Sequence, residues 1–343
     1  MKKLAMKINV MYETRNQPWG GGNQFLKALK EEFIKKGIYE ESPQIADVIL
    51  FNSHHNLEEV FKIKKNFSEK IFIHRIDGPV YLIRGRNKNL DRIIYRFNNL
   101  IADGTIFQSK WCLKENMNFF QIPTKYQTSI YNAPNKDIFN KKNKRAFGQG
   151  KTRLIATSWS SNMRKGFDIY KYLDENLNFS KYEMTFVGNS PVYFKNIKHI
   201  KPVSSIELAN ILKEHDIYIT ASQNDPCSNS LIEALSCGLP AVVLNSGGHL
   251  ELVGKGGEFF FAERDIIEKI DKVAKNYNYY IKRIKEFSID TVAKNYYEFA
   301  QKIYKDAKQK KYVVKKLDFY KKIEFYKIKM VFLRMSIKNK IFS

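Results

Sequence analysis

Hydrophobic and polar positions divide the chain into short apolar runs and longer stretches with helical spacing. Runs such as 6–11 and 46–52 are almost wholly apolar, which is typical of strands covered on both faces of a sheet. The stretches 23–36 and 57–65 repeat apolar residues every three or four positions, which predicts amphipathic helices. Strands that alternate with helices favour an α/β protein with parallel sheets.

The same alternation continues on both sides of a polar stretch, 136–150. This stretch is rich in Lys, Asn and Gly and nearly free of apolar residues, which predicts an exposed linker. Before it, further strands are expected at 70–76, 104–108 and 128–132, with helices at 90–100 and 110–117. After it, we expect strands at 153–157, 184–188, 198–202, 217–220, 241–244 and 259–261, and helices at 264–279 and 289–307.

A chain of 343 residues is too long for one ordinary α/β core, so two domains are expected. We place a first Rossmann-like domain at 1–135, the linker at 136–150 and a second Rossmann-like domain at 151–287. A helix at 288–308 and a basic tail at 309–343 follow. Each domain is expected to contain its own parallel sheet.

The C-terminal segment 305–343 is strongly basic, with 13 Lys and Arg against 3 Asp and Glu. Its apolar residues follow steps of three and four, which place them on one helical face. Such a helix can pack on its own protein, pair with a partner or lie on an anionic membrane surface, and the sequence leaves these alternatives open. The residues of this face are Phe319, Ile323, Tyr326, Met330, Leu333 and Ile337.

The net charge of +24 raises the question of a polyanionic partner. The basic residues are spread along the chain rather than concentrated in one module. No helix-turn-helix, zinc-finger or RNA-binding signature is present in the sequence. We therefore expect no nucleic-acid partner.

The cysteines and the hydropathy of the chain indicate in which cellular compartment the protein is expected. Cys112, Cys227 and Cys237 are isolated and lack metal-ligand spacing, as expected of reduced thiols. The sequence shows no signal-peptide pattern, and no apolar run reaches the roughly 20 residues of a membrane span. We expect a cytoplasmic protein that is either free or peripheral on the cytoplasmic membrane face.

The stretch 222–251 combines two glycine turns with two expected helix starts. A polar loop ends at Ser228, a helical apolar run follows, and Gly238 ends that run. Gly247-Gly248 then opens a second helix. Free backbone N–H groups at helix N-termini favour phosphate, and Ser228 and Ser230 add hydroxyl donors at the first of them.

Glu233 is expected in the first turn of the helix that follows Ser228. A carboxylate there would lie beside a bound anion, where the ribose hydroxyls of a nucleotide need acceptors. The alternative is a surface charge that compensates the helix dipole.

Asp225 and Glu233 are separated by seven residues and are followed by Cys-Gly-Leu-Pro at 237–240 and Gly-Gly-His-Leu-Glu at 247–251. This combination resembles the nucleotide-sugar site of the retaining GT-B glycosyltransferases of family 4, the glycosyl transferases group 1. Asp225 stands where the family has a first glutamate. The resemblance implies two Rossmann-like domains with parallel sheets that face each other across a cleft, and a helix at 288–308 that crosses back to the first domain.

The resemblance also implies residue roles. Glu233 would bind the ribose, Asp225 would approach the donor sugar, and backbone N–H groups would hold the diphosphate. Lys165-Gly166 matches half of a Gly-Arg and Lys-Gly pattern whose cations neutralise the diphosphate, and the Arg half is absent. Arg164 either substitutes for it or is solvated. The donor-binding residues are then Gly21, Gly22, Gly188, Ser228, Asn229, Ser230, Leu231, Glu233, Gly248 and Glu251.

Gly21 and Gly22 lie between the first expected strand and the first helix, so they form an anion-facing turn. The turn is not G-x-G-x-x-G and no acidic residue in the right context follows, so a dinucleotide fold is poorly supported. By resemblance the loop lies near the donor phosphates, with Asn23 on the acceptor side. An ordinary flexible loop is the alternative.

Polar residues follow the expected strands of the first domain, and ligands in open α/β sheets bind at such strand ends. His74, Arg75 and Asp77 combine an imidazole, a fixed cation and a carboxylate at one edge. The string 74–79 resembles the acceptor-side loop of the family. His74 and Asp77 would position or deprotonate the acceptor, with Arg75 beside them, and a structural buried histidine is the alternative for His74.

These observations predict a retaining, hexosyl or related glycosyltransferase that moves a sugar from a nucleotide-sugar to a hydroxyl acceptor, such as a cell-surface glycan or lipid-linked saccharide. The catalytic residues would be Lys165, Asp225, His74 and Asp77. The chain has no D-x-D motif, so we expect no metal, and the nucleotide-sugar is a substrate rather than a cofactor. Two alternatives stay open: a nucleotide-sugar epimerase of the same fold, and a catalytically silent binding module.

Overall fold

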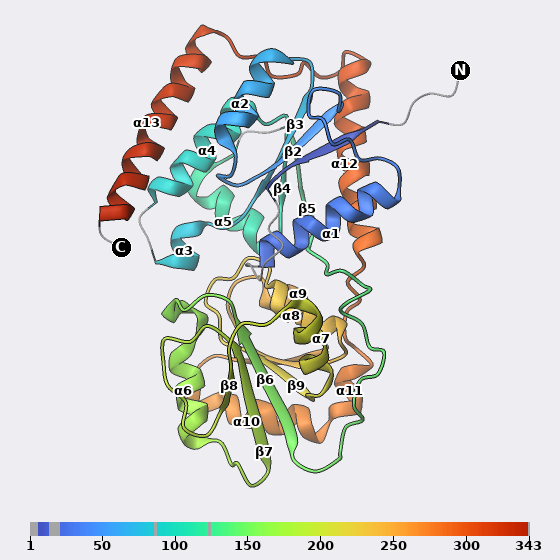
Figure 1. Ribbon diagram of the computed structural model, residues 1–343, viewed down its shortest axis with the longest axis vertical. Helices are drawn as coiled ribbons and strands as arrows, with labels where there is room; N and C mark the ends of the chain where they lie inside the picture. The colour runs from blue at the N-terminus through green and yellow to red at the C-terminus, as the bar shows by residue number, and fades with distance from the viewer. Residues whose placement is uncertain (1–5, 14–20, 86–87, 123–124, 342–343) are drawn as a thin grey trace. The chain divides into compact units, whose positions relative to one another are not determined.

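The computed structural model describes residues 6–13, 21–85, 88–122 and 125–341, with the side chains of 336–341 outside the description. The chain forms two compact units (Figure 1). Unit 1 comprises 1–13, 29–131 and 290–343, and unit 2 comprises 14–28 and 132–289. Each unit contains one parallel sheet, so the α/β class predicted from the alternation of elements is confirmed.

Unit 1 is built on a five-stranded sheet in the order β1-β2-β3-β4-β5. The first four strands are buried along their whole length, which explains their nearly continuous apolar sequences. All neighbouring strands are parallel. The strands are β1 (Ile8–Met11), β2 (Val48–Asn52), β3 (Ile71–Ile76), β4 (Gly104–Phe107) and β5 (Tyr126–Ser129). The helices are α1 (Gly21–Lys35), whose first residues cluster with unit 2, α2 (Leu57–Asn66), α3 (Val80–Arg84), α4 (Asn89–Ile101), α5 (Lys110–Phe120), α12 (Ile289–Lys308) and α13 (Phe319–Ile341).

A buried ion pair joins α2 to the start of β4. Lys64 and Asp103 have fully buried side chains, 3.4 Å apart. Asp103 also accepts hydrogen bonds from the backbone N–H of Phe72, the Tyr312 hydroxyl and the backbone N–H of Lys315. The Asp103 carboxylate therefore joins the segment before α13 to the amino-terminal end of β4.

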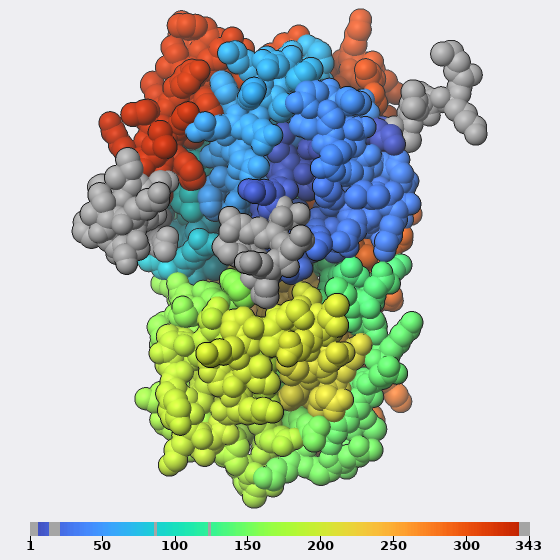
Figure 2. Space-filling model, viewed as in Figure 1, coloured from blue at the N-terminus to red at the C-terminus, as the bar shows by residue number. Residues whose placement is uncertain are grey.

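Helix α13 packs on unit 1 through a face that the sequence analysis did not select. Phe325 stacks on Phe61 with ring centroids 3.6 Å apart, and Ile328 is fully buried. The described residues of the expected stripe face outward instead, since Phe319 is 71% exposed and Tyr326 is 57% exposed, and the side chain of Ile337 lies outside the description. The helix carries apolar residues on two faces, so spacing alone could not decide which one is buried. Figure 2 shows α13 in red at the surface, and no described helix is long and apolar enough to cross a membrane.

Unit 2 is built on a six-stranded parallel sheet in the order β11-β10-β9-β6-β7-β8. The strand order reverses between β6 and β9, and ligands of open α/β sheets bind at the carboxyl ends of the strands at such a switch point. The strands are β6 (Thr152–Ser158), β7 (Tyr182–Gly188), β8 (Lys198–Ile200), β9 (Ile217–Thr220), β10 (Ala241–Leu244) and β11 (Gly257–Phe260). The helices are η1 (Met163–Lys165), α6 (Phe167–Asn176), α7 (Ser205–Lys213), α8 (Asn229–Ser236), α9 (His249–Val253), α10 (Glu263–Lys275) and α11 (Tyr277–Ile281).

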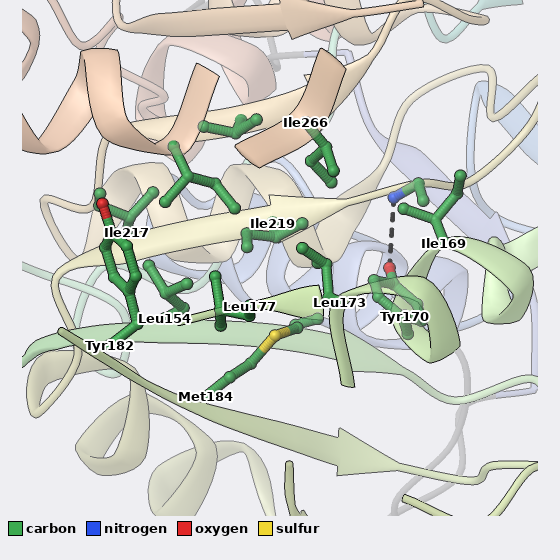
Figure 3. Packing of buried hydrophobic residues seen from close by; sticks show 14 of the residues in the cluster. Leu154, Ile169, Tyr170, Leu173, Leu177, Tyr182, Met184, Ile217, Ile219 and Ile266 are labelled. Atoms are coloured by element: carbon green, nitrogen blue, oxygen red, sulfur yellow. Dashed lines mark hydrogen bonds between the residues drawn. The ribbon is translucent and has the colours of Figure 1, made fainter. Parts of the chain in front are cut away.

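The core of unit 2 lies between this sheet and its helices (Figure 3). Leu154 and Ile219 from the two central strands pack with Leu173 of α6 and Ile266 of α10. The Tyr170 hydroxyl accepts a hydrogen bond of 3.2 Å from the backbone N–H of Ala221. This contact joins the packed core to the first residue after β9, and so fixes the start of the loop at the switch point.

Residues 136–150 contain no helix or strand, and most of them are exposed, but part of the segment packs on unit 2. Phe139 is buried, and Lys144 donates a hydrogen bond of 2.8 Å to the carbonyl of His215. The backbone N–H of Arg145 donates to the carbonyl of Lys213. The segment packs on unit 2 because two aromatic rings, Phe139 and Phe147, and the aliphatic stems of its lysines cover apolar surface.

Candidate functional site

The loop after β9 ends in a capped helix N-terminus. Ser228 is the N-cap of α8, and its hydroxyl accepts from the backbone N–H of Leu231. The Ser230 hydroxyl lies 3.2 Å from that of Ser228. The helix begins at Asn229, as the sequence predicts, and its first backbone N–H groups have no partner within the helix. This end of α8 therefore offers donors of the kind that hold phosphate.

The first residue of α1, Gly21, lies against the start of α8. A Cβ added at Gly21 would be 2.6 Å from the Cβ of Asn229, so only glycine allows this approach. The same Asn229 accepts a hydrogen bond of 3.0 Å from the Asn132 side chain. Gly22 has open space where a side chain would be, while Asn23 is buried. Two helix N-termini thus come together within unit 2.

An ion pair joins the loops that follow β6 and β9. The Lys165 ammonium donates a hydrogen bond of 2.9 Å to the Asp225 carboxylate. Gly166 holds the Lys165 turn close to the sheet, since its φ is +85° and a Cβ there would be 2.2 Å from the Cβ of Ala221. Burial acts to raise the pKa of Asp225, but the nearby Lys165 cation and its hydrogen bonds outweigh burial and lower it. Asp225 is therefore ionised and held in place.

The turn after β10 meets the same aspartate. The backbone N–H of Gly248 donates 2.8 Å to the carbonyl of Asp225. A Cβ at Gly247 would be 2.3 Å from that carbonyl oxygen, so the turn requires glycine. Glu251 follows in the first turn of α9. Three loops from the carboxyl ends of β6, β9 and β10 therefore meet around Asp225.

His249 is a buried residue of this turn that the sequence analysis quoted only as part of a motif. Its Nδ1–H donates 3.0 Å to the carbonyl of Leu244, and its Nε2 has no hydrogen-bond partner among the described residues. Burial lowers the pKa of His249, against the opposing effect of Asp225. The signal that could have identified it is its position directly after the glycine pair.

Glu233 is buried, which corrects the expectation that it projects from the first turn of α8. It is the fifth residue of the helix, and it is 8% exposed. Burial raises the pKa of Glu233 to about 8. Glu233 lines a cavity of about 20 Å³, which has room for a single water, together with Phe25, Asn229 and Ile232. It is therefore not a dipole-compensating surface charge.

Gly188 ends β7 against the central strand. Its φ is +129°, and a Cβ there would be 1.9 Å from the carbonyl oxygen of Ser158. The Gly188 carbonyl accepts a hydrogen bond of 2.8 Å from His199. This close packing places the end of β7 beside the end of β6, while donor binding at Gly188 stays a prediction.

A second polar cluster lies at the carboxyl ends of β2 and β3 in unit 1. Arg75 is fully buried and donates hydrogen bonds of 2.6 Å to both Asn52 and Asp77. The Asn52 amide donates 3.0 Å to the other oxygen of Asp77, and Gln108 also donates to this carboxylate. Both oxygens of Asp77 are thus held by neighbours. The sequence analysis did not include Asn52 and Gln108 in a site, although each lies at or directly after the end of a strand.

His74 has the surroundings of a structural histidine. It is fully buried and stacks on Phe51 with ring centroids 4.3 Å apart. Its Nε2–H donates 2.8 Å to the carbonyl of Ser53, and its Nδ1 accepts from Asn98. Burial lowers the pKa of His74 to about 3. Both ring nitrogens of His74 have hydrogen-bond partners inside the unit. This favours a structural role over the role of a base that deprotonates the acceptor.

Comparison with known proteins gives independent evidence. Residues 193–288 match the family Glycosyl transferases group 1, a stretch that includes Asp225 and Glu233 but not Lys165. No curated protein sequence matches the chain. Solved structures match over nearly its whole length.

Sucrose-phosphate synthase from Thermosynechococcus elongatus matches with a TM-score of 0.63 and 12% identity, over 97% of this chain and 100% of that chain. A glycosyltransferase from Rickettsia africae matches with a TM-score of 0.61 and 13% identity, over 89% of this chain and 100% of that one. HepE from Anabaena, in complex with UDP-glucose, matches with a TM-score of 0.60 and 12% identity, over 89% of this chain and 100% of that chain. The chain has the GT-B fold.

At these identities the likeness concerns the GT-B fold, so function has to be argued from the site. Within unit 2 of this GT-B chain, the structure brings together Lys165, Asp225 and the turn around Gly248, with Gly21 beside Asn229. Among the described residues, no group of three or more His, Cys, Asp and Glu side chains could hold a metal ion.

Proposed function

We propose that the chain is a glycosyltransferase whose unit 2 binds a nucleotide-sugar and whose reaction transfers the sugar to a hydroxyl acceptor with retention. The observation that carries the proposal is the meeting of Lys165, Asp225 and the N-terminus of α8 at the switch point of the sheet. The match of 193–288 to Glycosyl transferases group 1 supports it, as does the solved complex of HepE with UDP-glucose.

The diphosphate of the donor would lie at the start of α8. The backbone N–H groups of Asn229 and Ser230 and the Ser230 hydroxyl are the donors there, and the helix dipole favours negative charge. Lys165 would neutralise the charge that grows on the leaving diphosphate as the glycosidic bond breaks. This assignment requires no metal ion.

Asp225 and His249 would face the sugar of the donor. Asp225 is ionised and can accept hydrogen bonds from sugar hydroxyls, while its pairing with Lys165 limits the cost of its burial. The Nε2 of His249 is an acceptor in the same region. Gly248 and Glu251 complete the turn around the sugar.

Glu233 would accept hydrogen bonds from the ribose. Glu233 lines the same small cavity as Asn229, the first residue of α8, so it lies close to the proposed diphosphate site. A raised pKa means that the free protein holds this carboxyl largely protonated at neutral pH. Ribose hydroxyls would favour its ionised form and draw its pKa down.

The acceptor would bind at the polar cluster of unit 1, where Asp77 is oriented by Arg75 and Asn52. Asp77 would position the acceptor hydroxyl. We propose a cell-surface glycan or a lipid-linked saccharide as the acceptor class, and a cytoplasmic protein that is peripheral on the membrane. The outward apolar stripe of α13 and the basic charge around it support that location.

A two-step experiment tests the proposal. Calorimetric titration with UDP-, GDP- and CMP-sugars should identify one donor that binds, and that donor should then be turned over only when a membrane extract supplies an acceptor. An isomerised donor in the tube without extract would assign the site to an epimerase. If no nucleotide-sugar binds the folded protein, the proposal fails at its first step.

A further inference from the structure

A second hollow lies in unit 1, away from the switch point of unit 2. Its volume is about 540 Å³, within the range of small-molecule pockets. One wall is formed by residues 54–59, which are the end of the loop after β2 and the first turn of α2, and the other is the inner face of α13. Both walls belong to unit 1, so the cavity is a property of that unit alone.

The floor of this cavity is apolar. Phe325, Ile328 and Leu57 are all buried, and Phe332 of α13 lines the same space. At its rim, Lys329 of α13 pairs with Glu58 of α2 at 3.0 Å. An apolar interior with a charged rim fits an alkyl chain whose polar end stays outside.

One wall of the cavity follows closely, along the chain, on a residue of the polar cluster of unit 1. His54 lines the cavity, stacks on His55, and lies two residues beyond Asn52. Asn52 in turn donates its hydrogen bond to Asp77. Burial lowers the pKa of His54 to about 4, so the ring is neutral at physiological pH and does not place a charge in the wall.

We propose that this cavity holds the alkyl chain of an amphiphilic acceptor whose saccharide lies at Asp77. The inference rests on the proposed function and adds the substrate class to it. The outer face of α13 supports an alkyl chain over other occupants, because Phe319, Tyr326 and Met330 are exposed in a strongly basic segment suited to an anionic lipid surface. Helix α13 would then meet the lipid surface on one face and hold a single chain on the other.

The test uses alkyl maltosides as probes and the full-length protein. Dodecyl maltoside, kept below its critical micelle concentration, should bind with one-to-one stoichiometry, and maltose should not bind. Affinity should rise about fourfold for each added methylene until the cavity is full. A flat dependence on chain length would overturn the proposal.

Two neighbouring residues of α13 provide a matched pair of variants. Phe332→Ser places a hydroxyl in the cavity wall and should weaken dodecyl maltoside binding about tenfold or more, whereas Leu333→Ser removes an outward-facing residue and should leave it within about twofold. Equal loss in both variants would assign binding to the outer face of the helix. If Phe332→Ser does not fold, Phe332→Trp narrows the cavity instead and should shorten the longest chain that binds.

Failure of this inference is distinguishable from failure of the proposed function. If nucleotide-sugars bind and are turned over but maltosides do not bind, the cavity assignment is wrong and the transferase stands. If maltosides bind as expected but no donor does, the transferase is wrong. A dimer at high protein concentration that Phe332→Ser abolishes would mean that a second copy of the chain occupies the cavity, which also overturns the inference.

Discussion

Lys165 and Asp225 lie on loops that follow two adjacent parallel strands, and their charged groups meet at 2.9 Å. The Lys165 ammonium compensates the energetic cost of burying the charged Asp225 carboxylate, and the carboxylate orients the ammonium. A cation held in this way reaches a growing negative charge without reorganisation, which is the condition for electrostatic catalysis.

Lys165→Ala should therefore lower kcat more than it weakens donor binding. The charge on the leaving diphosphate grows toward the transition state, so the lost interaction counts most there. We expect kcat to fall about 100-fold or more, by analogy with the loss of one preorganised donor. Steady-state kinetics against donor concentration measure this, with Lys171→Ala on the exposed side of α6 as the control. An unchanged kcat would remove Lys165 from the mechanism.

Glu233→Gln should act on donor binding rather than on turnover. The ribose hydroxyls do not change charge during the reaction, so a hydrogen bond to them is equal in the ground and transition states. Loss of a hydrogen bond to a charged group costs about 1.5 to 3 kcal/mol, so the donor KM should rise about 10- to 100-fold. Glu207→Gln, in the first turn of α7, is the control. Unaltered donor binding by a folded Glu233→Gln protein would contradict the ribose assignment.

The raised pKa of Glu233 predicts a pH dependence of donor binding. In the free protein the carboxyl is protonated below about pH 8 and ionised above it. Because the ribose favours the ionised form, donor affinity should increase from pH 6 to 9, and binding at pH 7 should release a proton. Calorimetry in buffers of different ionisation enthalpy measures that proton. The Glu233→Gln variant should release no proton when the donor binds. If it still does, the proton comes from another group.

Much of the fold could be predicted from the sequence because most strands, such as β2 and β10, are short and nearly continuous apolar runs. The start of α8 could be predicted as well, since Ser228 is a favourable N-cap directly before a helical run. The Lys-Gly pair and Asp225 were both selected by resemblance, but their contact depends on the strand order of unit 2. That β6 and β9 are neighbours in the sheet could not be predicted from the pattern of the sequence.

Other features depend on packing that no local pattern encodes. Glu233 is buried because Phe25 and Ile232 pack around it, although its sequence position suits a surface charge. Phe139 is buried within a stretch whose composition is that of a linker. His74 lies in the core because its two nitrogens find partners there, in Ser53 and Asn98.

The buried pair Lys64 and Asp103 predicts a large stability effect. Asp103→Ala would leave the fully buried Lys64 without its counter-charge and would release the Tyr312 hydroxyl. We expect a loss of about 3 to 5 kcal/mol in the free energy of unfolding, measured by urea denaturation. Glu298→Ala, which removes one partner of an exposed pair on α12, should cost less than about 0.5 kcal/mol. If the double variant Lys64→Met with Asp103→Leu is no more stable than Asp103→Ala, the cost does not come from the unpaired charge.

Helix α13 contributes to the core of unit 1 with one face and is proposed to contact a membrane with the other. Truncation at Lys308 removes Phe325 and Ile328 from the core of unit 1, so it should destabilise that unit and is not a clean test of membrane binding. Substitution of the outer face avoids this difficulty. Phe319→Ser combined with Tyr320→Ser and Tyr326→Ser changes only side chains that are more than half exposed.

This triple variant should unfold at the temperature of the unsubstituted protein but lose binding to anionic vesicles. The apolar stripe inserts at the lipid interface, and the surrounding lysines are attracted to anionic headgroups, so both contributions are needed for binding. Sedimentation with vesicles containing phosphatidylglycerol measures binding, and vesicles of phosphatidylcholine alone serve as the uncharged control. Raised salt should weaken binding of the unsubstituted protein, because screening reduces the attraction of the lysines. Equal sedimentation of the triple variant and the unsubstituted protein would mean that α13 does not contact the membrane, and that the basic charge of the segment serves the solubility of the chain instead.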